Sequence, residues 1–216
     1  MSYLKRQTVP KNWPIPRKGT AYVVRPSFGI DAGLPILIIL RDLLKIAQNR
    51  KEVKKALISG KILLNGKKVK DEKHTAVLFD VISIIPSKKY FKIDLTEKGK
   101  FKVKEITEAE SKKKIAKVID KKILKGKKIQ LNLGDGRNFI SNLKCSTNDS
   151  VVIDFIGKKI EKCLPFEEKA KIIVFSGKHS GERGNIIKIE QNSKLIEVEI
   201  EGKKVNILNK QLMVVE

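Results

Sequence analysis

The chain has 216 residues, of which 47 are Lys or Arg and 24 are Asp or Glu, so its formal net charge at pH 7 is +23. An excess of like charge this large destabilises an isolated compact state through self-repulsion. A permanent anionic partner removes that difficulty, and nucleic acid is the usual one. At this length we expect one large domain or two to three small ones.

Several classes of function fit the composition poorly. No apolar run approaches the roughly 20 residues of a membrane-spanning helix, and the basic residues are spread over predicted strands and turns. Cys145 and Cys163 fit neither a disulfide framework nor a zinc site, which needs four clustered ligands. We expect both to be buried, reduced thiols of an intracellular protein. Since His74 and His179 are the only histidines, we expect no metal, no cofactor and no catalytic residue.

The first segment, 1–36, is rich in proline and in basic residues, and its apolar residues follow neither the helical nor the strand period. Prolines keep such a segment extended. We expect it to be largely disordered alone and to clamp onto RNA, with its aromatic rings against the protein or against bases. A flexible tail with Trp13 tucked against the domain is the alternative. Its candidate RNA-binding residues are Lys5, Arg6, Arg17 and Arg25.

Segment 37–86 predicts two helices, the second of which has clear ends. Asn49 stands at its N-cap, with Glu52 at the spacing of a capping box. Val53, Ala56 and Leu57 recur on one helical face, which we expect to pack against a hydrophobic core. Gly60 is predicted to end the helix as a left-handed residue.

A hairpin and a strand follow this helix. Asn65-Gly66 is the strongest two-residue signal for a type I′ turn, because both positions need a positive φ. The segment from Val77 to Ile85 is predicted to be the last strand. We expect the helix and the hairpin tip to grip a polyanion. The candidate RNA-binding residues here are Arg41, Arg50, Lys51, Lys54, Lys55, Lys61, Asn65, Gly66, Lys67 and Lys68.

Segment 87–168 predicts a small β-rich domain. Ile129, Leu131 and Leu133 alternate as in a half-buried strand, whereas Ile115 to Leu124 is ambiguous and only its second half is predicted as strand. Gly134-Asp135-Gly136 is predicted to be a turn. Its N–H groups could touch a phosphate, but a plain hairpin turn is the simpler account. The other predicted features are the hairpin strands Tyr90 to Leu95 and Phe101 to Ile106, a capped helix at Thr107, and the pair Val151 to Phe155 and Lys158 to Cys163.

Segment 169–216 predicts four strands and a glycine-rich loop. Gly177, Gly181 and Gly184, at spacings of four and three, predict a tight structural turn with positive φ values. The loop lacks the Gly-Lys-Ser/Thr ending of a P-loop, so we do not expect nucleotide hydrolysis. Lys178 and Arg183 are its candidate RNA-binding residues.

Two of these segments resemble known nucleic-acid-binding modules. One series resembles the RNA-binding module first seen in small-subunit ribosomal protein S-four, although Phe79 stands where that family usually has Gly. It comprises Arg41, Asn49-Arg50, Lys54-Lys55, Gly60-Lys61, Asn65-Gly66 and Phe79-Asp80-Val81-Ile82. A second series resembles the KOW motif, found on five-stranded SH3-like barrels of ribosomal proteins and elongation factors. It comprises Val174, Gly177, Gly181, Gly184 and Ile187.

The order of the parts resembles the archaeal and eukaryotic small-subunit ribosomal protein family called "S-four, e-type". The matching landmarks are Leu4-Lys5-Arg6, Pro10 to Trp13, Arg25-Pro26-Ser27, Leu34-Pro35, Asp80 to Ile84, Asp135-Gly136-Arg137 and the loop Ser176 to Gly184. The resemblance implies a multi-domain α+β fold: a basic N-terminal arm (1–36), a two-helix α+β RNA-binding module (37–86), a central β-rich domain (87–168) and a KOW SH3-like barrel (169–216).

The same resemblance implies a structural constituent of the small ribosomal subunit in the cytoplasm. Its partners would be small-subunit rRNA and neighbouring ribosomal proteins, with no membrane and no small-molecule substrate. Base identity would matter little, because the folded shape of the RNA is read instead. Two alternatives remain. An RNA-modifying enzyme needs a catalytic pocket, for which Asp135 is the only tempting residue. A transient KOW-type transcription or translation factor would bind only briefly.

Overall fold

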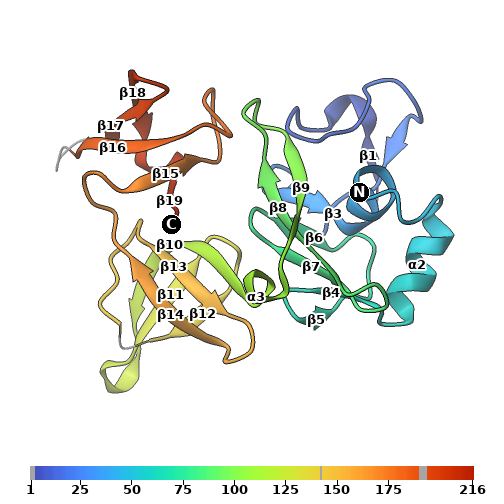
Figure 1. The fold of residues 1–216 in the computed structure, drawn as a ribbon, viewed down its shortest axis with the longest axis horizontal. Helices are drawn as coiled ribbons and strands as arrows, with labels where there is room; N and C mark the ends of the chain where they lie inside the picture. The colour runs from blue at the N-terminus through green and yellow to red at the C-terminus, as the bar shows by residue number, and fades with distance from the viewer. Residues whose placement is uncertain (1–2, 142, 190–193) are drawn as a thin grey trace. The chain divides into compact units, whose positions relative to one another are not determined.

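The structure, a computed structural model, describes residues 3–141, 143–189 and 194–216. It is mostly β with a few short helices, so the α+β prediction overstated the helices; the longest, α2 (Arg50–Ile58), has nine residues. The chain divides into two compact units, Met1–Thr96 with Lys100–Lys112, and Glu97–Gly99 with Lys113–Glu216. Each unit is described by itself (Figure 1).

The first unit contains one five-stranded antiparallel sheet and two small strand pairs. The sheet has the order β5-β4-β7-β8-β9, and the pairs are β1-β2 and β3-β6. The strands are β1 (Leu4–Lys5), β2 (Tyr22–Val23), β3 (Gly33–Pro35), β4 (Ile62–Leu64), β5 (Lys67–Lys68), β6 (Thr75–Val77), β7 (Val81–Ile84), β8 (Lys89–Leu95) and β9 (Phe101–Ile106). The helices besides α2 are η1 (Arg6–Thr8), α1 (Ile36–Ile38), the π-helical η2 (Ile39–Leu43) and α3 (Glu108–Ser111).

The local signals of the first unit are confirmed. The Asn49 side chain accepts a hydrogen bond from the Glu52 N–H at 3.0 Å, and so caps α2. Gly60 follows the helix with a φ of +68°. Asn65 and Gly66 have φ values of +51° and +76°, as a type I′ turn requires. Thr107 and Glu110 form the predicted capping box of α3.

The segment predicted as one strand from Val77 to Ile85 is broken in the structure. Phe79 has a φ of +64°, a left-handed conformation that ends β6 and starts β7 in a new direction. The Asp80 carboxylate holds this corner by accepting from the Val77 N–H at 2.7 Å. The Phe79 ring is buried, with the Lys92 ammonium 4.6 Å from its centroid. A bulky residue therefore occupies a backbone conformation that favours glycine.

The predicted hairpin of β8 and β9 is present, and it extends the first sheet. β8 pairs with β7 through partners such as Ile82 and Phe91, so the first compact unit continues as far as Lys112. The four-part division of the chain made from the sequence stays a prediction.

The second unit contains two five-stranded antiparallel sheets, with the orders β12-β11-β10-β13-β14 and β18-β17-β16-β15-β19. Its strands are β10 (Lys113–Ile123), β11 (Ile129–Leu133), β12 (Asn138–Ile140), β13 (Ser150–Asp154), β14 (Lys159–Leu164), β15 (Lys171–Val174), β16 (Arg183–Ile189), β17 (Leu195–Ile200), β18 (Lys203–Leu208) and β19 (Leu212–Val214). Two short 3₁₀ turns are η3 (Lys125–Lys127) and η4 (Asn209–Gln211). The sequence did not decide between helix and strand for the first half of β10, and it did not predict β19.

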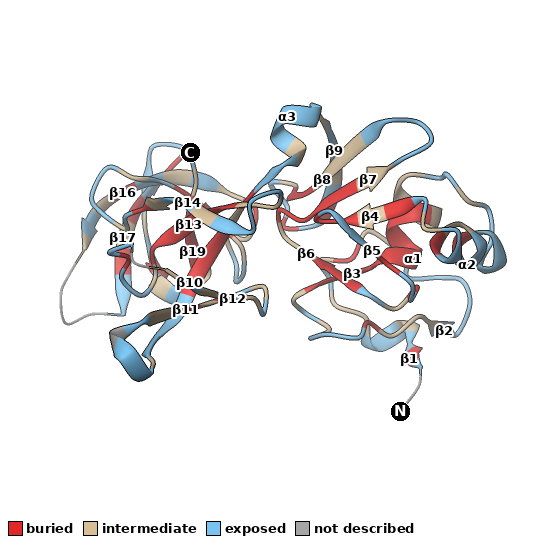
Figure 2. Ribbon diagram, turned by 90° about the horizontal axis from the view of Figure 1, so that it is seen from below, coloured by how far each residue is buried: buried red, intermediate tan, exposed pale blue. Residues whose placement is uncertain are grey.

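The two sheets of the second unit share a hydrophobic core. Val152 and Leu164 of the first sheet pack in one cluster with Ile172 and Ile196 of the second. Lys117 on β10 also joins them, because its ammonium donates to the carbonyls of Asn209 at 2.6 Å and Leu212 at 2.8 Å. Burial lowers the pKa of Lys117 to about 8. Buried residues follow β10 and β13 in this unit, and α1, β7 and β8 in the first (Figure 2).

The corner at Phe79 yields a prediction about two opposed effects. Phe79→Ala removes the buried ring at a cost of about 3–5 kcal/mol. It also keeps the backbone strain, because alanine still has a Cβ in a left-handed conformation. Phe79→Gly loses the same ring but regains about 1 kcal/mol of backbone strain. We expect urea denaturation to rank the free energy of unfolding as wild type, then Gly, then Ala. Equal stability of the two variants would show that the backbone at Phe79 is not strained.

Candidate RNA-binding surfaces

The N-terminal arm is ordered against the first unit, contrary to the expectation of a largely disordered segment. β1 and β2 pair with each other, and the Trp13 side chain is buried. The Phe101 N–H donates to the Asn12 carbonyl and the Ser27 N–H to the Lys73 carbonyl, each at 2.9 Å. Through these bonds, the Asn12 carbonyl and the Ser27 N–H of the arm gain partners that an extended, proline-rich segment does not provide within itself. Sequence periodicity missed them because they join residues far apart in the chain.

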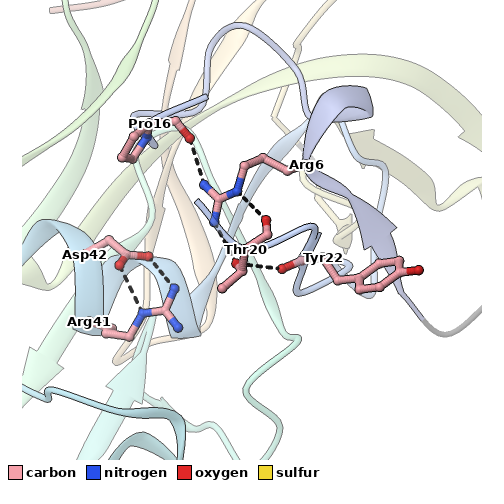
Figure 3. A network of polar contacts seen from close by, with 6 residues as sticks. All are labelled: Arg6, Pro16, Thr20, Tyr22, Arg41 and Asp42. Atoms are coloured by element: carbon pink, nitrogen blue, oxygen red, sulfur yellow. Dashed lines mark hydrogen bonds and ion pairs between the residues drawn. The ribbon is translucent and has the colours of Figure 1, made fainter. Parts of the chain in front are cut away.

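Arg6 organises the arm (Figure 3). Its guanidinium donates to the Pro16 carbonyl at 2.7 Å, the Thr20 carbonyl at 2.6 Å and the Thr20 hydroxyl at 2.9 Å. These acceptors are neutral, so the positive charge of Arg6 is not cancelled by them. Lys5 and Arg17 are exposed in the arm, and Arg25 is partly buried. Arg6 was predicted as an RNA contact, and the structure gives it a positioning role as well.

The second candidate surface joins α2 to the β4–β5 hairpin, and we call it the helix–hairpin face. Its members are Arg50, Lys51, Lys54, Lys55, Lys61, Lys67 and Lys68. All seven are exposed. The Lys68 side chain reaches the end of α2, since a Cβ built on Gly60 would lie 3.6 Å from its Nζ. The fold thus gathers the predicted helix and hairpin cations on neighbouring elements.

Some of the predicted cations have carboxylate partners within the protein. Arg50 forms an ion pair with the buried Glu72, which Lys54 approaches at 3.7 Å. Arg41 makes a bidentate pair with Asp42, at 3.0 and 2.8 Å. Hydrogen bonds to these carboxylates raise the pKa of Arg50 and of Arg41 above the usual value, so both stay charged. Their charge is already partly balanced, which the sequence did not indicate.

Other members of the helix–hairpin face have no such partner. Lys51, Lys55, Lys61 and Lys67 are exposed, and the structure gives none of them a carboxylate partner among the described residues. Asn65, at the tip of the same hairpin, is buried. Its amide donates to Asp80 at 2.7 Å and accepts from the Val81 N–H at 2.9 Å. Its side chain fixes the turn, whereas Gly66 is exposed.

The glycine loop of the second unit differs in part from its prediction. Gly177 and Gly181 have φ values of +95° and +93°. Gly184 does not adopt a positive φ; it lies inside β16, where a Cβ would stand 2.1 Å from the Glu199 carbonyl oxygen. Close approach of two strands, and not turn geometry, therefore requires this glycine. Lys178 and Arg183 are exposed at the two ends of the loop.

Asp135, the only residue that suggested catalysis, is part of a buried ion pair. Its carboxylate lies 2.8 Å from the ammonium of Lys114, whose side chain is 1% exposed. It also accepts from the Arg137 N–H at 3.1 Å, within the predicted turn. Burial alone would raise the pKa of Asp135, but the Lys114 ammonium and this hydrogen bond lower it below its usual value. Asp135 is thus a structural anion.

The two cysteines are free; Cys145 is buried and Cys163 is partly buried rather than buried as predicted. Burial, with Cys145 and Asp149 nearby, raises the pKa of Cys163 well above its usual value. The thiolate is the reactive form, so this shift favours the less reactive, protonated thiol.

Three cations that the sequence analysis did not single out, Lys11, Lys18 and Lys100, line hollows in the arm. One signal was available: no Asp or Glu precedes Asp31 in the chain. Every Lys and Arg of that segment, including Lys11 and Lys18, is therefore without an acidic neighbour in the sequence, and this pattern could have marked them as candidate RNA contacts.

Comparisons with known proteins identify the family. A profile described as Ribosomal family S4e matches residues 87–160, and one described as RS4NT (NUC023) domain matches residues 3–29. Small ribosomal subunit protein eS4 of Methanocella arvoryzae is 38% identical over 192 residues, covering 88% of this chain and 81% of that protein. The chain belongs to the eS4 family.

Further relatives agree with this assignment. The eS4 protein of Archaeoglobus fulgidus is 36% identical over 207 residues, with 94% of this chain and 87% of the relative covered. The crystal structure of 30S ribosomal protein S4e from Thermoplasma acidophilum matches with a TM-score of 0.73 at 25% identity, covering 85% of this chain and 95% of that one. The fold is therefore that of eS4 proteins, a family of ribosomal proteins and not of enzymes.

The two family profiles fall on parts with different physical character. Residues 3–29 are the basic arm, and residues 87–160 run from the β8–β9 hairpin to β14, including the Lys114–Asp135 pair.

Within the residues that the structure describes, the helices are too short or too polar to span a bilayer.

The buried Lys114–Asp135 pair of this eS4 protein yields a prediction, and the adjacent lysine of β10, Lys113, offers a matched control through its pair with Glu161. Asp135→Asn removes the carboxylate that faces the buried Lys114, which we expect to cost about 3–5 kcal/mol of unfolding free energy. Glu161→Gln breaks the exposed neighbouring pair with Lys113, at 2.8 Å, and should leave stability close to wild type. Urea denaturation at pH 7 measures both. Similar losses in the two variants would contradict the structural role of Asp135.

The same pair predicts a pH dependence. Because the pKa of Asp135 is lower in the folded than in the unfolded chain, its contribution is present above its unfolded pKa and is lost as the pH falls through the folded pKa. We expect wild type to lose stability between about pH 5 and pH 2, and Asp135→Asn to lose less over that range. Parallel curves would contradict this.

Proposed function

We propose that this eS4 protein is a structural constituent of the small ribosomal subunit that holds folded rRNA through its arm and its helix–hairpin face. The observation that carries the proposal is an excess of 23 positive charges, together with exposed lysines that lack carboxylate partners among the described residues. In such a protein the RNA supplies the missing negative charge. Its place is the ribosome in the cytoplasm, and its partners are small-subunit rRNA and neighbouring ribosomal proteins.

The mechanism is electrostatic and geometric. Each lysine or arginine that neutralises a phosphate releases condensed counterions, so affinity falls with salt with a log–log slope of about −0.7 to −0.9 per contact. The contacts are to the sugar–phosphate backbone, which makes the shape of the folded RNA, and not its base sequence, the feature recognised. The candidate contacts are the arm cations, the helix–hairpin face, Lys178 and Arg183.

The finer division of the fold belongs to the same proposal. We assign the region around α2 and the β4–β5 hairpin to the S-four-type RNA-binding module, and β15 to β19 to a KOW SH3-like barrel. The turn at Asn65 and Gly66 supports the first assignment. The five-stranded sheet and the positive φ values of Gly177 and Gly181 support the second.

Sedimentation of ribosomal subunits tests the proposal. A structural constituent should stay with small subunits, in equal amount, through a high-salt wash. A transient translation factor would be released by that wash, and an enzyme would be present in much less than equal amount. Either result would contradict the proposal.

Neighbouring residues of α2 yield a prediction. Lys51 and Lys55, one helical turn apart, lack carboxylate partners among the described residues, whereas Lys54 approaches Glu72. Lys51→Ala/Lys55→Ala should therefore flatten the salt slope by about 1.4–1.8, two phosphate contacts' worth. Lys54→Ala should flatten it by less than about 0.7, because its charge is partly balanced already.

Filter binding of a folded small-subunit rRNA fragment, between low and moderate salt, measures these slopes. Alanine favours helix, so none of the variants should unfold α2. A double variant with the wild-type slope would remove α2 from the RNA-binding surface.

A further inference from the structure

Two open hollows lie along the arm, and they are next to each other because Arg6, Gln7 and Arg17 line both. Their volumes are about 570 Å³ and about 390 Å³. Both fall within the range of small-molecule sites, about 300–1,000 Å³. Each hollow is thus large enough for one part of a nucleotide.

The first hollow is strongly positive. Lys5, Arg6, Arg17 and Lys18 line it, and no carboxylate lines either hollow. The structure gives none of these four cations a carboxylate partner among the described residues. Because the three hydrogen-bond acceptors of Arg6 are neutral, its charge also contributes to the field. A hollow of this kind attracts a phosphate.

The first hollow is held in shape before any ligand arrives. Arg6 ties the Pro16 carbonyl to Thr20, which fixes the loop carrying Arg17 and Lys18 (Figure 3). Gly19 has a φ of +138°, and a Cβ there would stand 3.2 Å from the Arg6 Cζ. The loop therefore lies directly on the guanidinium. A preformed site loses less entropy on binding than a flexible one.

The second hollow combines apolar and basic walls. Val9, Pro10, Trp13 and Ile15 line it together with Arg6, Lys11, Arg17 and Lys100. A nucleobase offers flat apolar faces to the first group, and carbonyl or ring-nitrogen acceptors at its edge to the N–H groups of the second.

An aromatic ring stands at the rim. Tyr22 lines the first hollow and is 57% exposed, with Tyr3 packed edge-on at 4.9 Å. Exposed, fixed aromatic rings stack on unpaired bases.

We infer that the paired hollows of the arm take one unpaired nucleotide of the RNA. Its phosphate lies against Lys5, Arg17 and Lys18, and its base enters the second hollow beside Trp13. The next base along the strand stacks on Tyr22. This inference rests on the proposed function and adds to it a preference for an unpaired nucleotide, which a fully paired helix does not satisfy.

Two RNA hairpins test the inference with the full chain. They are identical except that one carries a single unpaired nucleotide in its stem. We expect the hairpin with the unpaired nucleotide to bind about tenfold more tightly. Trp13 is the only tryptophan, so its fluorescence reports on the second hollow directly. That fluorescence should change with the unpaired nucleotide and stay nearly constant with the fully paired hairpin.

Matched variants separate the hollow from general electrostatics. Arg17→Ala/Lys18→Ala should reduce the tenfold preference to less than twofold. Lys89→Ala/Lys104→Ala removes two exposed lysines of β8 and β9, and should weaken both hairpins equally while keeping the preference. Circular dichroism verifies that each variant is folded.

Three results would overturn the inference. One is equal affinity of the wild-type chain for the two hairpins. Another is an unchanged preference in Arg17→Ala/Lys18→Ala. The third is competition by polyglutamate as strong as that by the hairpin with the unpaired nucleotide, which would assign the hollow to an acidic protein segment. If both hairpins bind tightly but equally, the inference fails while the proposed function stands; if neither binds, the proposed function fails as well.

Discussion

The fold depends on how the chain uses its buried carboxylates. Asp80 holds the corner between β6 and β7, and Asp149 accepts hydrogen bonds from the N–H groups of Ser146 and Phe166. Asp135 neutralises the buried Lys114, and Glu72 lies against Arg50 and Lys54. Each anion is committed to the protein's own backbone or to one of its own cations. With 47 basic residues against 24 acidic ones, the cations outside this network exceed what the protein can balance.

This division of charge connects the structure to the proposed role. The arm is positioned by Arg6 through neutral acceptors, so it is ordered without losing its positive charge. In α2, Arg50 and Lys54 are partly balanced by Glu72, whereas Lys51 and Lys55 are not. The same helix therefore combines structural cations with cations available to a phosphate. A polyanion completes the charge balance that the fold leaves open.

The sequence predicted those features that depend on neighbouring residues. Asn49 as a cap, the Asn65-Gly66 turn and the alternating strand β11 are set by contacts within a few positions, and the structure confirms them. What it could not predict depends on distant partners. The order of the arm rests on Phe101, and the need for Gly184 comes from Glu199 on another strand.

The candidate site divides in the same way. Residue type and spacing identified the basic segments, and the structure places the helix and hairpin cations on neighbouring elements. Local patterns did not indicate that Arg41 is paired or that Asn65 faces inward, because burial and pairing are properties of the folded chain. Whether each exposed cation touches RNA stays a prediction. The family membership rests on identity along most of the chain and not on any single site.

The central claim is that the cations of the free protein repel one another because its carboxylates are used elsewhere. The most direct test is the free energy of unfolding of the RNA-free chain, measured by urea denaturation at pH 7 in 20 mM and in 500 mM potassium chloride, conditions between which screening shortens from roughly 20 Å to about 4 Å. Our account predicts that the protein is more stable at high salt, because screening weakens the repulsion. Equal or lower stability at high salt would contradict it, since the surface cations would then be balanced by ion pairs within the protein.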